Sequence, residues 1–203
     1  MSSFFDNTKT VGIAFLVVGF ILIVSAIFAI AMGFIDVDDD MKEGIDNWMP
    51  YCVVGGIGSL ISALLYTFFA MKVFNGTYSQ KIVILEKYVR IVGITMIIGE
   101  IFTAAAVIAG GQDIGASIVG AIVGILIGLL IVFISTKIND GKETVGDSII
   151  WIILLIAFII LLIVSILEFF TLILIIDGIA HLFIALFMIA FLFDPEVKKK
   201  MNM

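Results

Sequence analysis

The sequence predicts an all-α integral membrane protein with six transmembrane helices, arranged as three hairpins in a single domain over residues 1–203. Hydrophobic residues make up 63% of the chain and charged residues only 14%, whereas soluble domains have about half and about a quarter. The mean hydropathy is +1.30. The apolar residues form long continuous runs instead of the alternating pattern of a membrane β-barrel. A separate soluble domain is therefore not expected.

Six apolar runs are long enough to cross a bilayer, because a helix needs ~20 residues to span ~30 Å of hydrocarbon. We expect spans at approximately 11–34, 52–71, 91–110, 114–136, 148–167 and 172–193. The first run is longer than the apolar part of a signal peptide, so we expect it to remain as a helix. The very short connections at 111–113 and 168–171 favour pairing of neighbouring spans as hairpins.

The basic residues predict the orientation, because Lys and Arg accumulate on the cytoplasmic side of membrane proteins. With the amino terminus inside, the inner segments hold ten of the 11 basic residues: Lys9, Lys72, Lys81, Lys87, Arg90, Lys137, Lys142, Lys198, Lys199 and Lys200. Only Lys42 falls outside, within an acidic loop at 36–46. We therefore expect a multi-pass protein of the cell membrane with both termini in the cytoplasm.

Small residues recur at every fourth position in the second helix of the first two hairpins. They are Gly55, Ser59 and Ala63 in one hairpin and Gly120, Gly124 and Gly128 in the other, and the two sets align when Lys72 is matched to Lys137. Residues four apart share a helix face, and small side chains let helices approach closely in lipid. We expect this seam to be a packing surface within the protein or between copies, and the alignment suggests an internal repeat.

The third hairpin carries polar residues at the same positions. Asp177 and His181 replace the small residues there, although each charge at mid-bilayer costs ~2.5–3.5 kcal/mol on insertion scales. Glu100 lies about 15 Å into the third span, close to the expected depth of His181. Glu168 lies at the outer end of the fifth span. If these helices adjoin, the four side chains form a polar path from the outer surface to mid-membrane.

This cluster has two interpretations. One is a proton or cation site, in which His181 titrates near neutral pH and the carboxylates respond to burial and to their partners. The other is an interhelical polar clamp, since hydrogen bonds between membrane helices fix helix register. Both interpretations predict that Glu100 or Asp177 lies within hydrogen-bonding reach of His181, directly or through one water.

Other kinds of chemistry leave no pattern in the sequence. One histidine, one cysteine (Cys52) and scattered carboxylates make a poor metal-binding set. A phosphate-binding glycine loop, a serine nucleophile elbow, a redox cysteine pair and a basic nucleic-acid-binding domain are all missing from the sequence. We therefore expect neither an enzyme nor a cofactor-binding protein, and the expected partners are the lipid bilayer, another copy or a membrane complex.

Several glycine-containing segments resemble a known family. They are Gly12-Ile13 and Gly19 in the first span, Val92-Gly93-Ile94 and Gly99 in the third, and Ile176-Asp177-Gly178-Ile179 in the sixth. With six spans over its whole length, the chain resembles the HdeD-type acid-resistance membrane proteins, which are small six-helix proteins built from glycine-punctuated hairpins. The resemblance implies a role in envelope or acid stress and supplies no catalytic residues.

Two further functional hypotheses stand beside that resemblance. The first is a proton- or cation-coupled transporter or channel that uses Glu100, Asp177 and His181. The second is an accessory subunit of a larger membrane complex. Its docking face would be formed by the glycine stripe of the fourth span: Gly120, Gly124 and Gly128.

Overall fold

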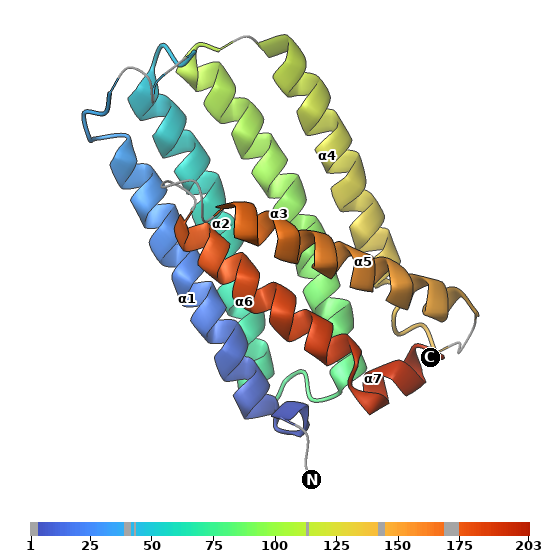
Figure 1. The fold of residues 1–203 in the computed structure, drawn as a ribbon. Helices are drawn as coiled ribbons and strands as arrows, with labels where there is room; N and C mark the ends of the chain where they lie inside the picture. Colours follow the sequence, from blue (N-terminus) through green and yellow to red (C-terminus); the bar gives the residue numbers. More distant parts are fainter. Residues whose placement is uncertain (1–3, 39–41, 43, 113, 142–144, 169–174) are drawn as a thin grey trace.

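The computed structural model describes residues 4–38, 42, 44–112, 114–141, 145–168 and 175–203 (Figure 1). The long helices are α1 (Thr8–Met32), α2 (Trp48–Phe74), α3 (Lys81–Gly110), α4 (Ile114–Ser135), α5 (Val145–Glu168) and α6 (Ile175–Leu192). Short helices η1 (Phe4–Asp6) and α7 (Pro195–Lys200) lie near the two ends of the chain. Within these described ranges, six helices are long and apolar enough to cross a membrane. The all-α architecture with six spans is confirmed.

The largest boundary difference is at α3, which begins at Lys81 instead of the expected 91. The added turns are amphipathic and bury Ile82, Leu85 and Tyr88 against the other helices, so they are helical although they carry charges on the opposite face. The other helix ends lie within a few residues of the expected positions. At the sixth span, 172–174 and the preceding turn residues 169–171 lie outside the described residues.

The three expected hairpins are present, but the third is oriented differently from the other two. Helices α1 to α4 stand side by side, each in contact with the next, whereas the α5–α6 pair crosses them obliquely (Figure 1). Helix α6 also packs against α1. Because of this tilt, the α6 end near Ile175 lies about halfway along α1 and α2 (Figure 1). The polar residues of the third hairpin therefore lie at the middle of the bundle.

The glycine stripe of α4 packs against α3 over part of its length. A Cβ built at Gly128 would lie 2.9 Å from the carbonyl oxygen of Gly93, and one at Gly124 would overlap the Glu100 side chain. Open space surrounds Gly120. The stripe is therefore a packing surface inside the protein at two of its three positions. Because α3 covers Gly124 and Gly128, these two residues are not available as a docking face for another protein.

In α2, the close helix contacts are made by glycines beside the predicted seam. A Cβ at Gly56 would lie 2.9 Å from the backbone nitrogen of Ile30 in α1, and one at Gly58 would overlap Phe102 in α3. At Gly55 the nearest atom would be 3.8 Å away, and Ser59 is exposed. Of the predicted seam, Ala63 is buried, whereas Gly55 and Ser59 make no close contact between helices of this chain, because the two neighbouring helices approach most closely at adjacent faces of α2.

Aromatic rings form the core of the bundle. Phe15 of α1 is fully buried and lies 5.0 Å from the ring centroids of both Phe69 and Phe187, and it stacks on Tyr88 at 5.7 Å. These rings join α1, α2, α3 and α6. Large apolar side chains such as Leu126 are exposed on the outside, which is the arrangement that a hydrocarbon solvent favours.

Both described ends of the chain lie at the same end of the bundle, because one lysine binds them together. The Nζ of Lys81 lies 2.7 Å from an Asp6 carboxylate oxygen and 2.9 Å from one of Asp194. Glu196 is 3.6 Å from the same ammonium group. Lys81 therefore joins η1, the start of α3 and the connection between α6 and α7.

Candidate intramembrane polar site

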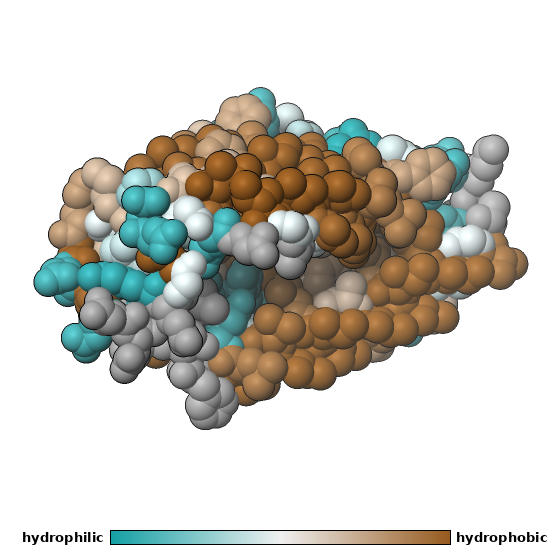
Figure 2. Space-filling view, turned by 90° about the horizontal axis from the view of Figure 1, so that it is seen from above, coloured by the Kyte–Doolittle hydropathy of each residue, from teal (hydrophilic) through white to brown (hydrophobic). Residues whose placement is uncertain are grey.

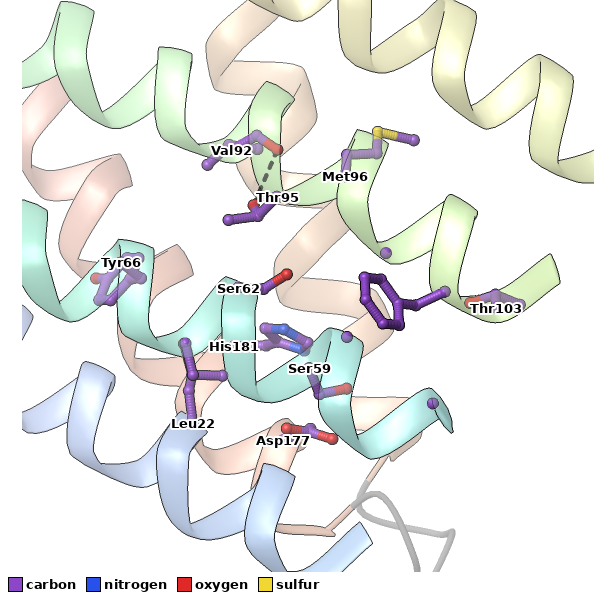
Figure 3. A pocket seen from close by; sticks show the side chains of 15 residues that line it. Leu22, Ser59, Ser62, Tyr66, Val92, Thr95, Met96, Thr103, Asp177 and His181 are labelled. Carbon is purple, nitrogen blue, oxygen red and sulfur yellow. Dashed lines mark hydrogen bonds between the residues drawn. The ribbon is translucent and has the colours of Figure 1, made fainter. Parts of the chain in front are cut away.

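A cavity of about 400 Å³ lies between α2, α3 and α6, with Leu22 of α1 at its edge (Figure 3). Leu22, Ser62 and Gly99 line it from near the middle of their helices. Seen from above, apolar side chains flank a hollow in the surface, and hydrophilic side chains gather towards one end of the molecule (Figure 2). The cavity therefore lies at a depth that a bilayer would cover.

Small side chains on two helices create this space. Gly55, Ser59 and Ser62 follow one face of α2, and Gly99 lies opposite them on α3, where nothing comes within 4 Å of a built Cβ. The helices stay together at this level through Gly58, which packs against Phe102. One face of α2 thus makes close contact while the adjacent face leaves a cavity.

The remaining wall of the cavity carries the polar residues of α6. Asp177 and His181 both line it, one helical turn apart. Figure 3 shows the His181 ring close to Ser59 and Ser62, with Asp177 near Ser59. The seam positions of the first and third hairpins therefore line the same cavity. The larger polar side chains on α6 are accommodated because the facing residues on α2 are small.

His181 is held by a carboxylate from α5. Its Nδ1 lies 2.8 Å from Oε2 and 3.1 Å from Oε1 of Glu168, which is 15% exposed. Gly178 makes this approach possible, since a Cβ there would lie 3.1 Å from the Glu168 Cβ. An ionised carboxylate only accepts hydrogen bonds, so this contact favours the tautomer with the proton on Nδ1. The second ring nitrogen, Nε2, is left for another partner.

We expected Glu100 or Asp177 to lie within hydrogen-bonding reach of His181, but among the described residues its hydrogen-bond partner is Glu168. Glu100 packs over Gly124 of α4, and it is not among the residues that line the cavity. Helix α3 turns its Gly99 towards the cavity, and the next residue points about 100° away around the helix. The hydrogen bond of His181 goes to Glu168, which the sequence analysis had placed at the outer end of the polar path. The oblique hairpin brings it to mid-bundle.

Two residues that line this cavity carry buried hydroxyl groups that we did not predict from the sequence. Within the described residues, the Oγ of Ser62 and the Oη of Tyr66 are buried without a hydrogen-bond partner. Both residues line the cavity, and Tyr66 is 6% exposed. Leaving such a group unpaired costs about 1–3 kcal/mol. Their spacing of four residues on one helix face was the signal in the sequence, but it has meaning only once the cavity is known.

Asp177 is the one carboxylate among the residues that line the cavity. It is partly exposed, and the described side chains form no hydrogen bond or ion pair with it. The Glu168–His181 pair lies behind it, so three ionisable side chains from α5 and α6 meet at this wall. Carboxylate and imidazole groups can take up a proton or pair with a cation, and this is the chemistry that the site offers.

The described residues contain no group of three or more His, Cys, Asp or Glu side chains placed to hold a metal ion. No family model, curated protein or solved structure matches this chain. Its candidate function is therefore argued from the cavity and its polar side chains.

Proposed function

We propose that this protein is a proton- or cation-coupled membrane transporter or channel without enzymatic activity, and that its coupling site is formed by Asp177, His181 and Glu168. One observation carries the proposal. The Glu168–His181 pair, 2.8 Å apart, stands beside Asp177 on the wall of a cavity at mid-bundle. Ionisable groups at such depth are costly, and they mark ion and proton pathways in many membrane proteins.

The chemistry of the three side chains suits proton exchange. Histidine changes its charge between pH 5 and 8. Glu168 orients the His181 ring through Nδ1, which leaves Nε2 to take up or release a proton on the cavity side. Asp177, one turn along the same face, offers the next acceptor. A proton on either group changes the charge of the cavity wall and hence its affinity for a cation.

The proposal includes the cytoplasmic placement of both termini, for which the distribution of basic residues is the support. It also includes a role in envelope or acid stress, in keeping with the resemblance to HdeD-type proteins. A site that takes up protons as the pH falls is the kind of site such a role requires. The apolar outer surface of α4, which includes Leu126, is expected to face lipid.

Proton flux in proteoliposomes tests the proposal. We would reconstitute the protein with a trapped pH indicator, impose a pH step, and record the internal pH with and without added monovalent cations. We expect flux from the wild type and from Glu100→Gln, whose side chain faces α4. Asp177→Asn should reduce the rate to that of empty liposomes while the protein stays folded.

The matched variants separate transport from a structural clamp. If Glu168, Asp177 and His181 only hold helices together, wild-type liposomes should be as tight to protons as empty ones, and Asp177→Asn should change only stability. If Glu100→Gln abolished flux and Asp177→Asn did not, the coupling site would be at the α3–α4 interface and the proposal would be wrong.

A further inference from the structure

We propose that the cavity between α2, α3 and α6 binds a small organic cation, namely a protonated amine with a short apolar or aromatic body. This inference rests on the proposed transport function and names the class of substrate. It depends on three properties of the same cavity, which are its charge, its size and its unpaired hydroxyl groups.

The charge of the cavity favours a single positive group. Asp177 is the carboxylate that lines it, and Glu168 is already engaged by His181. Since a carboxylate is stabilised in its ionised form by an adjacent opposite charge, an ammonium group beside Asp177 would stabilise the ionised carboxylate. An anion would meet only this carboxylate and a histidine that is neutralised by its own partner.

The size of the cavity favours an organic molecule over a bare inorganic ion. Its volume is about 400 Å³, whereas one water occupies about 30 Å³, and small-molecule sites typically fall in the range of about 300–1,000 Å³. Several other residues that line the cavity are apolar, among them Leu22, Met96 and Phe102. An aromatic ring there also offers its face to a cation. A metal ion would find oxygen ligands on only part of this wall.

The unpaired hydroxyl groups favour a ligand that can form directional hydrogen bonds. Ser62 and Tyr66 line the cavity, and their hydroxyl oxygens are buried beneath its surface without a partner within the described residues. A protonated primary amine has three N–H donors, as a lysine ammonium does. One can bind Asp177, and another can bind the hydroxyl oxygen of Ser59, which is exposed and lines the same cavity.

The same carboxylate then links the amine to the proton. Asp177 can bind an ammonium group only when it is ionised, so a proton on Asp177 and a bound amine exclude each other. Protonation from the His181 side would release the amine, and its departure to one side of the membrane would be exchanged for a proton. This step is a proton transfer and needs no other reactant.

Calorimetry on the full-length protein in lipid nanodiscs tests this inference. The probes are benzylammonium, benzyl alcohol and benzoate, which share a ring and differ in charge. We expect benzylammonium to bind the wild type, and the other two probes to bind at least about tenfold more weakly. Asp177→Asn should weaken benzylammonium binding by a similar factor. Ser62→Leu, which fills the cavity without removing a charge, should weaken all binding. Glu100→Gln is the control and should bind as the wild type does.

The outcomes distinguish this inference from the proposed function. Equal binding of benzyl alcohol and benzylammonium, or unchanged binding in Asp177→Asn, would overturn the choice of an organic cation. Proton flux without benzylammonium binding would leave the transport proposal standing and refute the inference. Specific benzylammonium binding that depends on Asp177, in a protein without proton flux, would support the binding site and refute the coupling.

Discussion

The Nδ1 of His181 lies 2.8 Å from Oε2 of Glu168, and this contact joins α6 to α5 beside the turn of their hairpin. It orients the one histidine of the chain towards the cavity. The contact forms because Gly178, one turn before His181 on α6, lets that helix approach the end of α5.

The tautomer of His181 follows from that contact. Above its titration, the neutral ring should carry its proton on Nδ1, because Glu168 accepts a hydrogen bond there. Since the chain has one histidine, long-range ¹H–¹⁵N spectra of the labelled protein report it without assignment. Glu168→Leu should abolish the preference, and Glu100→Gln should not. A neutral ring protonated at Nε2 in the wild type would contradict the structure.

The three glycines of the α4 stripe should differ in their tolerance of a larger side chain. Gly128→Leu should destabilise most, because its Cβ would approach the Gly93 carbonyl oxygen at 2.9 Å, and backbone cannot rotate away. Overpacking of this kind costs about 1–3 kcal/mol or more. Gly124→Leu should cost less, since it meets the flexible end of Glu100. Gly120→Leu is the control and should be neutral in a detergent unfolding assay. A large loss from Gly120→Leu would reveal a contact between copies.

Lys81→Met should destabilise the end of the bundle that holds both termini. The change removes the ammonium group from Asp194, whose side chain is fully buried. Breaking a buried pair by removing one partner costs about 3–5 kcal/mol. Lys42→Met is the control, because its partner Asp36 is fully exposed, and it should leave the unfolding midpoint unchanged. Equal stability of the two variants would show that Lys81 contributes no more than a surface lysine.

Two glycines in α2 test which face of that helix packs. Gly58→Ala should lower the free energy of unfolding, because its Cβ would overlap the Phe102 side chain close to the α3 backbone. Gly55→Ala should be neutral or slightly stabilising, since its Cβ would stay 3.8 Å from Ala106 and alanine favours helix by about 1 kcal/mol over glycine. The midpoints of thermal unfolding of the two variants test this. A midpoint for Gly55→Ala below that of Gly58→Ala would contradict the packing of α2 on α3.

Cysteine labelling tests the orientation. In a Cys52→Ser background, Ser79→Cys lies between α2 and α3, and Asp38→Cys lies in the acidic loop after α1. If both termini are cytoplasmic, an impermeant reagent added to intact cells should label position 38 but not position 79. Permeabilised cells serve as the control, in which both should react. Labelling of position 79 in intact cells would reverse the proposed topology.

The number of spans and the pairing of the hairpins could be predicted because each apolar run contains its own signal. A run of about 20 apolar residues is stable in lipid as a membrane-spanning helix. A short connection between two such runs places the two helices next to each other as a hairpin. The glycine stripe of α4 was predicted as a packing surface for the same local reason, and α3 covers it at Gly124 and Gly128.

The candidate site was predicted only in part. Asp177 and His181 stand on one face of α6, and this follows from their spacing alone. Their partner does not follow from it, because depth along a helix does not say which way a neighbouring helix turns its side chains. Glu100 has a suitable depth and points to α4, while Glu168 reaches His181.

By itself, the sequence determined what the bilayer imposes on each segment, which is a helix of a given length, since this depends on local composition. The tertiary structure decided how the α5–α6 hairpin tilts across the other four helices, and thereby where its polar end lies (Figure 1). It also decided which small residues make contact, as at Gly58, and which leave space, as at Gly55 and Ser59. The physical reason is that a cavity belongs to several helices at once, and packing angles between helices are set by the sum of many weak contacts that no single segment contains.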